Sequence, residues 1–254
     1  MIEIIILGII QGITEFLTIS SSGHLVIFKD ILGLDTDNSI VIEIVLHFGT
    51  LLSILIFYRK EIKELIKGII EKDDDSISYF KFIIFSMLPI IIFVLFFEDK
   101  VVSSFSIKTL PITYLITSII LFSTRFKNNL KTSLNYKLVF DIGIAQVLAV
   151  FPGISRAGIT ISTAMLMGYD QKEAAKFSFF MAIPVLLGAV ILKIRDINSE
   201  LLLDGANLLI GLFVSMITGI VFLTFLISII SKQKLWVFSI YCLILCVYSY
   251  YGNL

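Results

Sequence analysis

The chain has 254 residues, of which 57% are hydrophobic and only 16% are charged. Its formal net charge at pH 7 is zero, so charge gives no indication of an anionic partner, and we expect no nucleic-acid partner. A charged fraction well below the roughly 25% usual for soluble domains excludes an ordinary soluble protein, and we predict an all-α integral membrane protein.

The first apolar region, Ile2 to Phe28, precedes every basic residue, since the first is Lys29. We therefore expect no cleaved signal peptide. The polar stretch EFLTISSSGHL, Glu15 to Leu25, interrupts this region. Irregular backbone within a membrane is tolerated only where protein or a water-filled cavity satisfies its polar groups. The pattern predicts a re-entrant helical hairpin with the polar stretch at its tip.

Six further segments are long enough, or nearly so, to cross a bilayer, which takes about 20 apolar residues. These predicted transmembrane helices are Ile44 to Tyr58, Phe82 to Phe97, Thr109 to Thr124, Phe177 to Leu192, Gly205 to Ser231 and Leu235 to Leu254. Most Lys and Arg residues fall in connections that would share one side of the membrane. The positive-inside rule then places both termini outside.

A second interrupted apolar region, Leu138 to Met167, predicts another re-entrant hairpin. Its segment IGIAQVLAVFPGISRAG aligns with LGIIQGITEFLTISSSG of the first region. Identical pairs are Gly8/Gly143, Ile9/Ile144, Gln11/Gln146, Phe16/Phe151, Ile19/Ile154, Ser20/Ser155 and Gly23/Gly158. Three spans follow each copy, so we predict one membrane domain, 1–254, built as an inverted-topology repeat of 1–130 and 131–254. Interrupted segments in corresponding positions of inverted halves predict a midplane site at the repeat interface.

If the two tips meet, one pocket gathers a carboxylate, hydroxyls, an imidazole and a guanidinium. Arg156 offers a planar donor fork suited to phosphate, and freed amides at a helix N-terminus also favour an anion. A base, candidate hydroxyl nucleophiles and an anion clamp together suit hydrolysis of a phosphoester or phosphoanhydride. The residues are Glu15, Ser20, Ser21, Ser22, His24, Ser155 and Arg156.

Simpler explanations compete for several of these residues. Serine clusters in membrane helices often only permit close packing. Glu43 and His47 lie four residues apart and are candidate ligands or members of a proton relay. Pairing of these polar side chains with residues of other helices explains their presence in the membrane equally well. Cys242 and Cys246 are expected to pack as small buried hydrophobes.

The motifs QGITEFLTISSSGHL and FPGISRAGIT resemble the two signature motifs of the bacterial undecaprenyl-diphosphate phosphatase family, also called the bacitracin-resistance protein family. The resemblance implies removal of one phosphate from a C55 isoprenoid diphosphate, which yields the monophosphate carrier lipid for peptidoglycan synthesis. It also implies a site open to the outer face of the plasma membrane and a divalent cation, Mg²⁺ or Ca²⁺. Thr18 stands where the first motif has proline, which predicts a less rigid turn, and Ala157 replaces a common serine.

Together, the chemistry and the resemblance assign roles to ten residues. We expect catalytic roles for Glu15, Ser21, His24 and Arg156, and phosphate-binding roles for Gln11, Ser20, Ser22, Gly23, Gly153 and Ser155. Glu15 is also a candidate metal ligand. In the expected mechanism a serine, Ser21 by preference, attacks the terminal phosphorus, and attack by water without a covalent intermediate is the alternative.

Two other function classes deserve comparison with this phosphatase hypothesis. Acid-phosphatase-like lipid phosphatases need a further histidine after their Ser-Arg motif, and none follows Arg156 in the sequence. A lipid transporter or flippase would suit an inverted repeat equally well, but transport alone needs no nucleophile and base. The expected partners are a polyprenyl diphosphate and membrane lipids. The sequence leaves the oligomeric state open, with a homodimer as one alternative.

Overall fold

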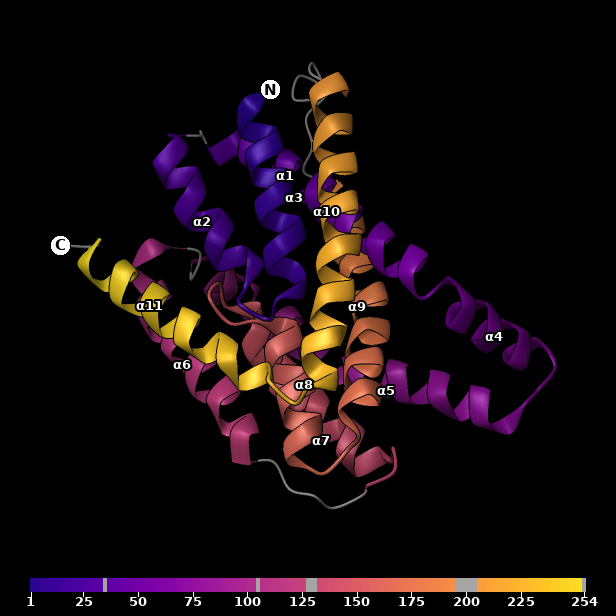
Figure 1. Cartoon of the computed structure of the whole chain (residues 1–254). Helices are drawn as coiled ribbons and strands as arrows, with labels where there is room; N and C mark the ends of the chain where they lie inside the picture. Colours follow the sequence, from indigo (N-terminus) through magenta and orange to yellow (C-terminus); the bar gives the residue numbers. More distant parts are fainter. Residues whose placement is uncertain (34–35, 104–105, 127–131, 195–204, 253–254) are drawn as a thin grey trace.

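The computed structural model describes residues 1–33, 36–103, 106–126, 132–194 and 205–252, and these residues form helices without strands (Figure 1). The predicted boundary between the repeats, at residues 130 and 131, lies outside this described part, as does Leu254 at the end of the last predicted span. The α-helices are α1 (Ile2–Phe16), α2 (Ser21–Leu32), α3 (Thr36–Phe57), α4 (Arg59–Ile70), α5 (Asp74–Ser103), α6 (Leu110–Ser123), α7 (Tyr136–Val147), α8 (Arg156–Leu166), α9 (Gln171–Ile194), α10 (Gly205–Ser231) and α11 (Phe238–Tyr251).

Several of these helices are long and apolar enough to cross a membrane. Four helical segments qualify by length and composition: Asp74–Phe97, Ile107–Phe126, Gln171–Ile191 and Gly205–Ser231. A fifth follows if Val41–Phe57 and Arg59–Ile70 count as one span, although the two are bent by 74°. Apolar side chains exposed on the outside of α5 and α10, such as Leu95 and Val221, suit contact with lipid tails. The protein is therefore an all-helical, multi-pass membrane protein.

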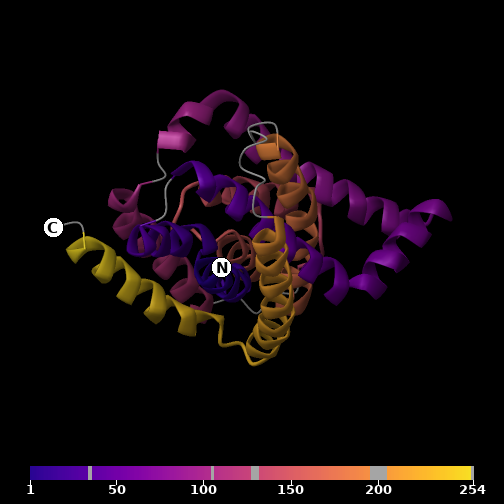
Figure 2. The same ribbon diagram turned by 90° about the horizontal axis from the view of Figure 1, so that it is seen from above.

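Each interrupted region folds into two helices joined by a short irregular tip. The tips lie at Leu17–Ser20 between α1 and α2, and at Phe151–Ser155 after η3 (Leu148–Val150) and before α8. In Figure 1 the α1–α2 pair enters from one end of the molecule and the α7–α8 pair from the other. Seen from above (Figure 2), α1 lies near the middle, between α10 and α11, while α4 and the start of α5 project outward.

The two hairpins pack on corresponding helices through corresponding glycines. Gly8 of α1 faces α10, where a Cβ would lie 3.1 Å from the backbone oxygen of Gly211. Gly143 of α7 faces α5, where a Cβ would lie 2.5 Å from the backbone oxygen of Ser86. A glycine at each crossing lets two helix backbones approach closely. The close approach packs α1 against α10 and α7 against α5, so each hairpin contacts a long helix from the other predicted half.

Candidate active site

The tips of both hairpins use the same local structure to begin their second helix. Ser20 is the N-cap of α2, where its Oγ accepts a hydrogen bond from the Gly23 N–H at 3.3 Å. Ser155 is the N-cap of α8, where its Oγ accepts from the Gly158 N–H at 3.1 Å. Capping serines satisfy one of the free amides at a helix start. In both copies, therefore, the serine caps the second helix and the glycine three residues later supplies the capped N–H.

The two tips contact each other directly. The Gly153 N–H donates to Ser20 Oγ at 3.1 Å. Gly153 has a φ of 92°, a conformation that glycine adopts at little cost. A Cβ on Gly23 would lie 2.6 Å from Tyr114 Oη and 2.9 Å from the Gly153 Cα, so this contact needs glycine. The hairpins from opposite ends of the molecule thus form one joint site.

Thr18 gives the first tip an unusual backbone. It has a φ of 63° and is fully buried. A proline ring holds φ near −65°, so proline cannot adopt this conformation. The turn therefore differs in its backbone path, and not only in rigidity, from a turn that carries proline at this position.

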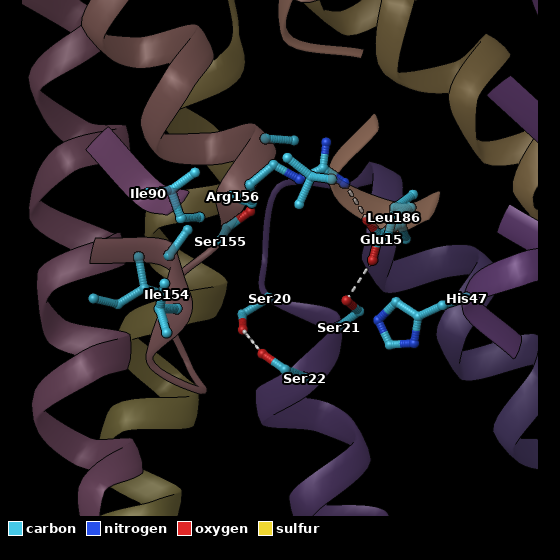
Figure 3. A pocket seen from close by; sticks show the side chains of 14 residues that line it. Glu15, Ser20, Ser21, Ser22, His47, Ile90, Ile154, Ser155, Arg156 and Leu186 are labelled. Atoms are coloured by element: carbon cyan, nitrogen blue, oxygen red, sulfur yellow. Dashed lines mark hydrogen bonds and ion pairs between the residues drawn. The ribbon is translucent and has the colours of Figure 1, made fainter. Parts of the chain in front are cut away.

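A hydrogen-bonded cluster centres on the Glu15 carboxylate (Figure 3). Arg156 Nη2 donates to Glu15 Oε1 at 2.6 Å. Glu15 Oε2 accepts from Ser21 Oγ at 2.5 Å and from Gln11 Nε2 at 3.2 Å. The Arg156 and Glu15 side chains are only 13% and 8% exposed, so the ion pair is largely shielded from solvent. Arg156 Nη1 is buried and has no hydrogen-bond partner among the described residues.

This cluster forms the wall of a cavity of about 240 Å³ between the tips. Its polar lining comes from Glu15, Ser20, Ser21, Ser22, His47, Ser155 and Arg156, and its apolar lining from Ile90, Ala149, Val150, Ile154, Ala157, Val185 and Leu186. A carboxylate, several hydroxyls and a partly free guanidinium can bind and activate a phosphate group, while the apolar wall suits a lipid.

Four of the ten predicted site residues lie behind the cavity and do not line it. Gln11 is fully buried and supports Glu15, while its Nε2 also lies 3.5 Å from Thr50 Oγ1. Gly23 and Gly153 supply backbone at the contact between the tips. The fourth is His24, and the other six line the cavity.

His24 lies on the far side of the first tip. It is 2% exposed, and its Nδ1 donates to the Ser20 backbone oxygen at 2.6 Å, because a carbonyl can only accept. Its Nε2 then accepts from the Tyr241 hydroxyl at 3.0 Å, and Tyr114 Oη lies 3.3 Å from Nδ1. These contacts place His24 as a support between the tip, α6 and α11.

The histidine on the cavity wall is instead His47 of α3. The sequence interpretation noted it beside Glu43 but did not include it in the site. A detectable signal was present, since His47 is the only other histidine in the chain and lies in a predicted span without charged residues. Lys29 forms an ion pair with Glu43, which connects α2 to α3 near this histidine.

The cavity offers a divalent cation few protein ligands. The described residues contain no group of three His, Cys, Asp or Glu side chains that would hold a metal ion. Among the described residues that line the cavity, Glu15 is the only carboxylate. This fits a cation such as Mg²⁺, which commonly binds through one or two carboxylates and takes its other ligands from substrate phosphates and water.

Comparison with known proteins gives one consistent result. A family model described as "Bacitracin resistance protein BacA" matches residues 4–248. Proteins named undecaprenyl-diphosphatase resemble the chain over nearly their whole length. Those of Christiangramia forsetii and Thermosipho melanesiensis are each 39% identical, covering 95% and 97% of this chain and 94% and 97% of the relatives. That of Methanococcus maripaludis is 38% identical, covering 94% of this chain and 95% of the relative. The chain belongs to the bacitracin resistance protein BacA family.

Proposed function

We propose that this protein is an undecaprenyl-diphosphate phosphatase. It hydrolyses the C55 isoprenoid diphosphate to the monophosphate carrier lipid and phosphate, which returns the carrier to peptidoglycan synthesis and confers bacitracin resistance. The observation that carries the proposal is the Ser21–Glu15–Arg156 cluster in a cavity of a membrane protein. The names of the relatives support the same activity.

The proposed architecture has six transmembrane helices and two re-entrant hairpins, arranged as an inverted-topology repeat within a single membrane domain. The matched capping serines and the matched glycine crossings of the two hairpins support this arrangement. We place the protein in the plasma membrane with the site open to the outer face. One copy supplies every cavity-lining residue considered, so the proposed chemistry does not require a homodimer.

In the proposed mechanism the isoprenoid tail lies against the apolar wall and the diphosphate enters the polar part of the cavity. Arg156 keeps Nη2 on Glu15 and offers Nη1 to the terminal phosphate. Ser21 Oγ attacks the terminal phosphorus and passes its proton to Glu15, which already accepts its hydrogen bond. The bond from phosphorus to the bridging oxygen breaks, and the lipid monophosphate leaves. A divalent cation would bind mainly through the substrate phosphates, with Glu15 as the nearby carboxylate, and would supply positive charge that stabilises the phosphate oxygens.

The decisive experiment measures phosphate release from undecaprenyl diphosphate by the purified protein in nanodiscs. We expect multiple turnovers that depend on Mg²⁺ or Ca²⁺ and stop on chelation. Glu15→Gln, which keeps the shape of the side chain, should abolish turnover. A transporter would instead move the lipid between leaflets without releasing phosphate, and that result would refute the proposed function.

A further inference from the structure

His47 lies where it can act on a molecule inside the cavity. It lines the wall from α3, and in Figure 3 its ring points toward Ser21 beside Glu15. It interacts electrostatically with the Glu15 carboxylate. Its Nδ1 donates to the Glu43 backbone oxygen at 2.8 Å, one helical turn earlier. This bond fixes the orientation of the ring and leaves Nε2 as the nitrogen that accepts a proton.

The Glu15 carboxylate cannot serve both steps of the proposed phosphatase reaction. Oε1 is bonded to Arg156, and Oε2 accepts from Ser21 and Gln11. Once Glu15 has taken the Ser21 proton, it has no further capacity to deprotonate water. Among the described cavity-lining residues, Glu15, His47 and Arg156 are the ionisable ones, and arginine stays protonated. His47 is the one group left to act as a base.

We infer that His47 accepts the proton of the water that attacks phosphorus, an inference that rests on the proposed function. The water oxygen bonds to phosphorus as the bond between phosphorus and Ser21 Oγ breaks. The water proton passes to His47 Nε2, and Ser21 Oγ regains the proton held by Glu15. His47 then releases its proton to solvent, and inorganic phosphate leaves.

The surroundings of His47 allow this role. The ionisable groups that face it across the cavity are Glu15 of α1 and Arg156 of α8. From α9, its neighbours at a smaller adjoining cavity are Ala189 and Val190, which are uncharged. On its own helix, Glu43 is paired with Lys29. In the proposed step Glu15 carries the Ser21 proton, so a proton taken up by His47 would lie in a cavity that also holds the negatively charged phosphate on Ser21.

The test uses His47→Gln, which removes the base and keeps a side chain of similar length. We expect turnover of undecaprenyl diphosphate to fall about 100-fold, in the range typical of losing a general base. The acidic limb of the pH–rate profile that a histidine base produces should disappear in this variant. With substrate labelled in the terminal phosphate, acid quenching should trap phosphorylated Ser21 in the variant.

Two controls separate this role from a structural one. Val190→Ala alters packing beside His47 without removing an ionisable group, and it should retain the acidic limb. His47→Ala opens space for added imidazole, which should restore part of the turnover. An active wild-type protein whose His47→Gln variant keeps the wild-type pH profile would overturn the inference alone. A wild-type protein that releases no phosphate would overturn the proposed function instead.

Discussion

Arg156 uses only one of its two terminal guanidinium nitrogens to bind Glu15. Nη2 holds Glu15 at 2.6 Å, while Nη1 is buried without a partner among the described residues. Arg156→Lys keeps the charge but provides a single ammonium that cannot serve both positions. We expect kcat/KM for phosphate release to fall at least tenfold, or about 1.4 kcal/mol of transition-state stabilisation. Arg125→Lys, at a site where Arg125 lies over the Trp236 ring, is the matched control and should stay near wild type. Equal activity of the two variants would remove Arg156 from the clamp role.

Gln11 and Gln146 occupy equivalent positions in the two copies but have different surroundings. Gln11 donates to Glu15, whereas position 150, which corresponds to Glu15, is Val150. Both polar atoms of the Gln146 side chain are buried without a partner among the described residues. An unsatisfied buried polar group costs about 1–3 kcal/mol. We expect Gln146→Met to raise the unfolding temperature and leave phosphate release intact.

The matched substitution Gln11→Met should lower phosphate release, because it removes a hydrogen bond that orients Glu15. Thermal unfolding of both variants in the same detergent, followed by the phosphate assay, makes the comparison. A lower unfolding temperature for Gln146→Met would mean that its amide contributes to stability.

The two histidines illustrate what single-residue patterns can predict. From the sequence, His24 was predicted to lie in the site because it follows Ser-Ser-Ser-Gly. The role of His47 was left open between a ligand, a proton relay and pairing with another helix. In the structure His24 supports the tip from behind, while His47 faces the cavity. The positive φ angles of Thr18 and Ser20 set the direction in which α2 leaves the tip. The direction of α2 after the tip cannot be predicted from the spacing of residues in the sequence.

At the scale of helices, the break between α3 and α4 modifies a predicted span. The sequence predicts a helix from Ile44 to Tyr58, and the structure ends α3 at Phe57 and turns by 74° into α4. α4 has no fully buried residue, and it combines apolar side chains with charged ones such as Arg59 and Lys60. The hydrophobic pattern located the helix, but the sharp bend depends on the change to an amphipathic helix.

The first tip gives a prediction that belongs to the hairpin as an element. Thr18 has a φ of 63°, and a left-handed conformation costs a non-glycine residue about 1–2 kcal/mol. Thr18→Gly should relieve this strain, so we expect a higher unfolding temperature with activity retained. Thr18→Pro requires a φ near −65° and should displace Ser20 and Ser21, so phosphate release should fall more than tenfold. The pair is measured in parallel in one detergent. Full activity of Thr18→Pro would show that the site does not depend on this backbone path.

At the scale of the whole molecule, the end of α6, the start of α7 and the turn between α10 and α11 lie toward one end (Figure 1). Arg125 lies 5.2 Å from the centre of the Trp236 ring, which brings the end of α6 to the turn between α10 and α11. Thr132 bonds to the backbone of Met167 and Gly168, which brings the start of α7 to the end of α8. The paired motifs predicted two interrupted regions with a break at the same place in each, and the structure has a helix pair with an irregular tip at both. The direct contact of Ser20 with Gly153 was not predictable, because it depends on three-dimensional packing.

This arrangement predicts which parts of the chain face each side of the membrane. In a Cys242→Ala, Cys246→Ala background, single cysteines are introduced at exposed positions by Glu3→Cys, Tyr251→Cys, Glu71→Cys and Lys232→Cys. Loops rich in Lys and Arg stay on the cytoplasmic side of the membrane, which leaves both ends of the chain outside. We therefore expect Glu3→Cys and Tyr251→Cys to react with a membrane-impermeant maleimide on intact cells. Glu71→Cys and Lys232→Cys should react only after the cells are permeabilised. Each variant must retain phosphate release, so that labelling reports the active fold.

Labelling of the two ends of the chain on opposite sides would contradict an even number of spans, and with it the inverted repeat. Labelling of Lys232→Cys on intact cells, with both ends protected, would turn the site toward the inner face.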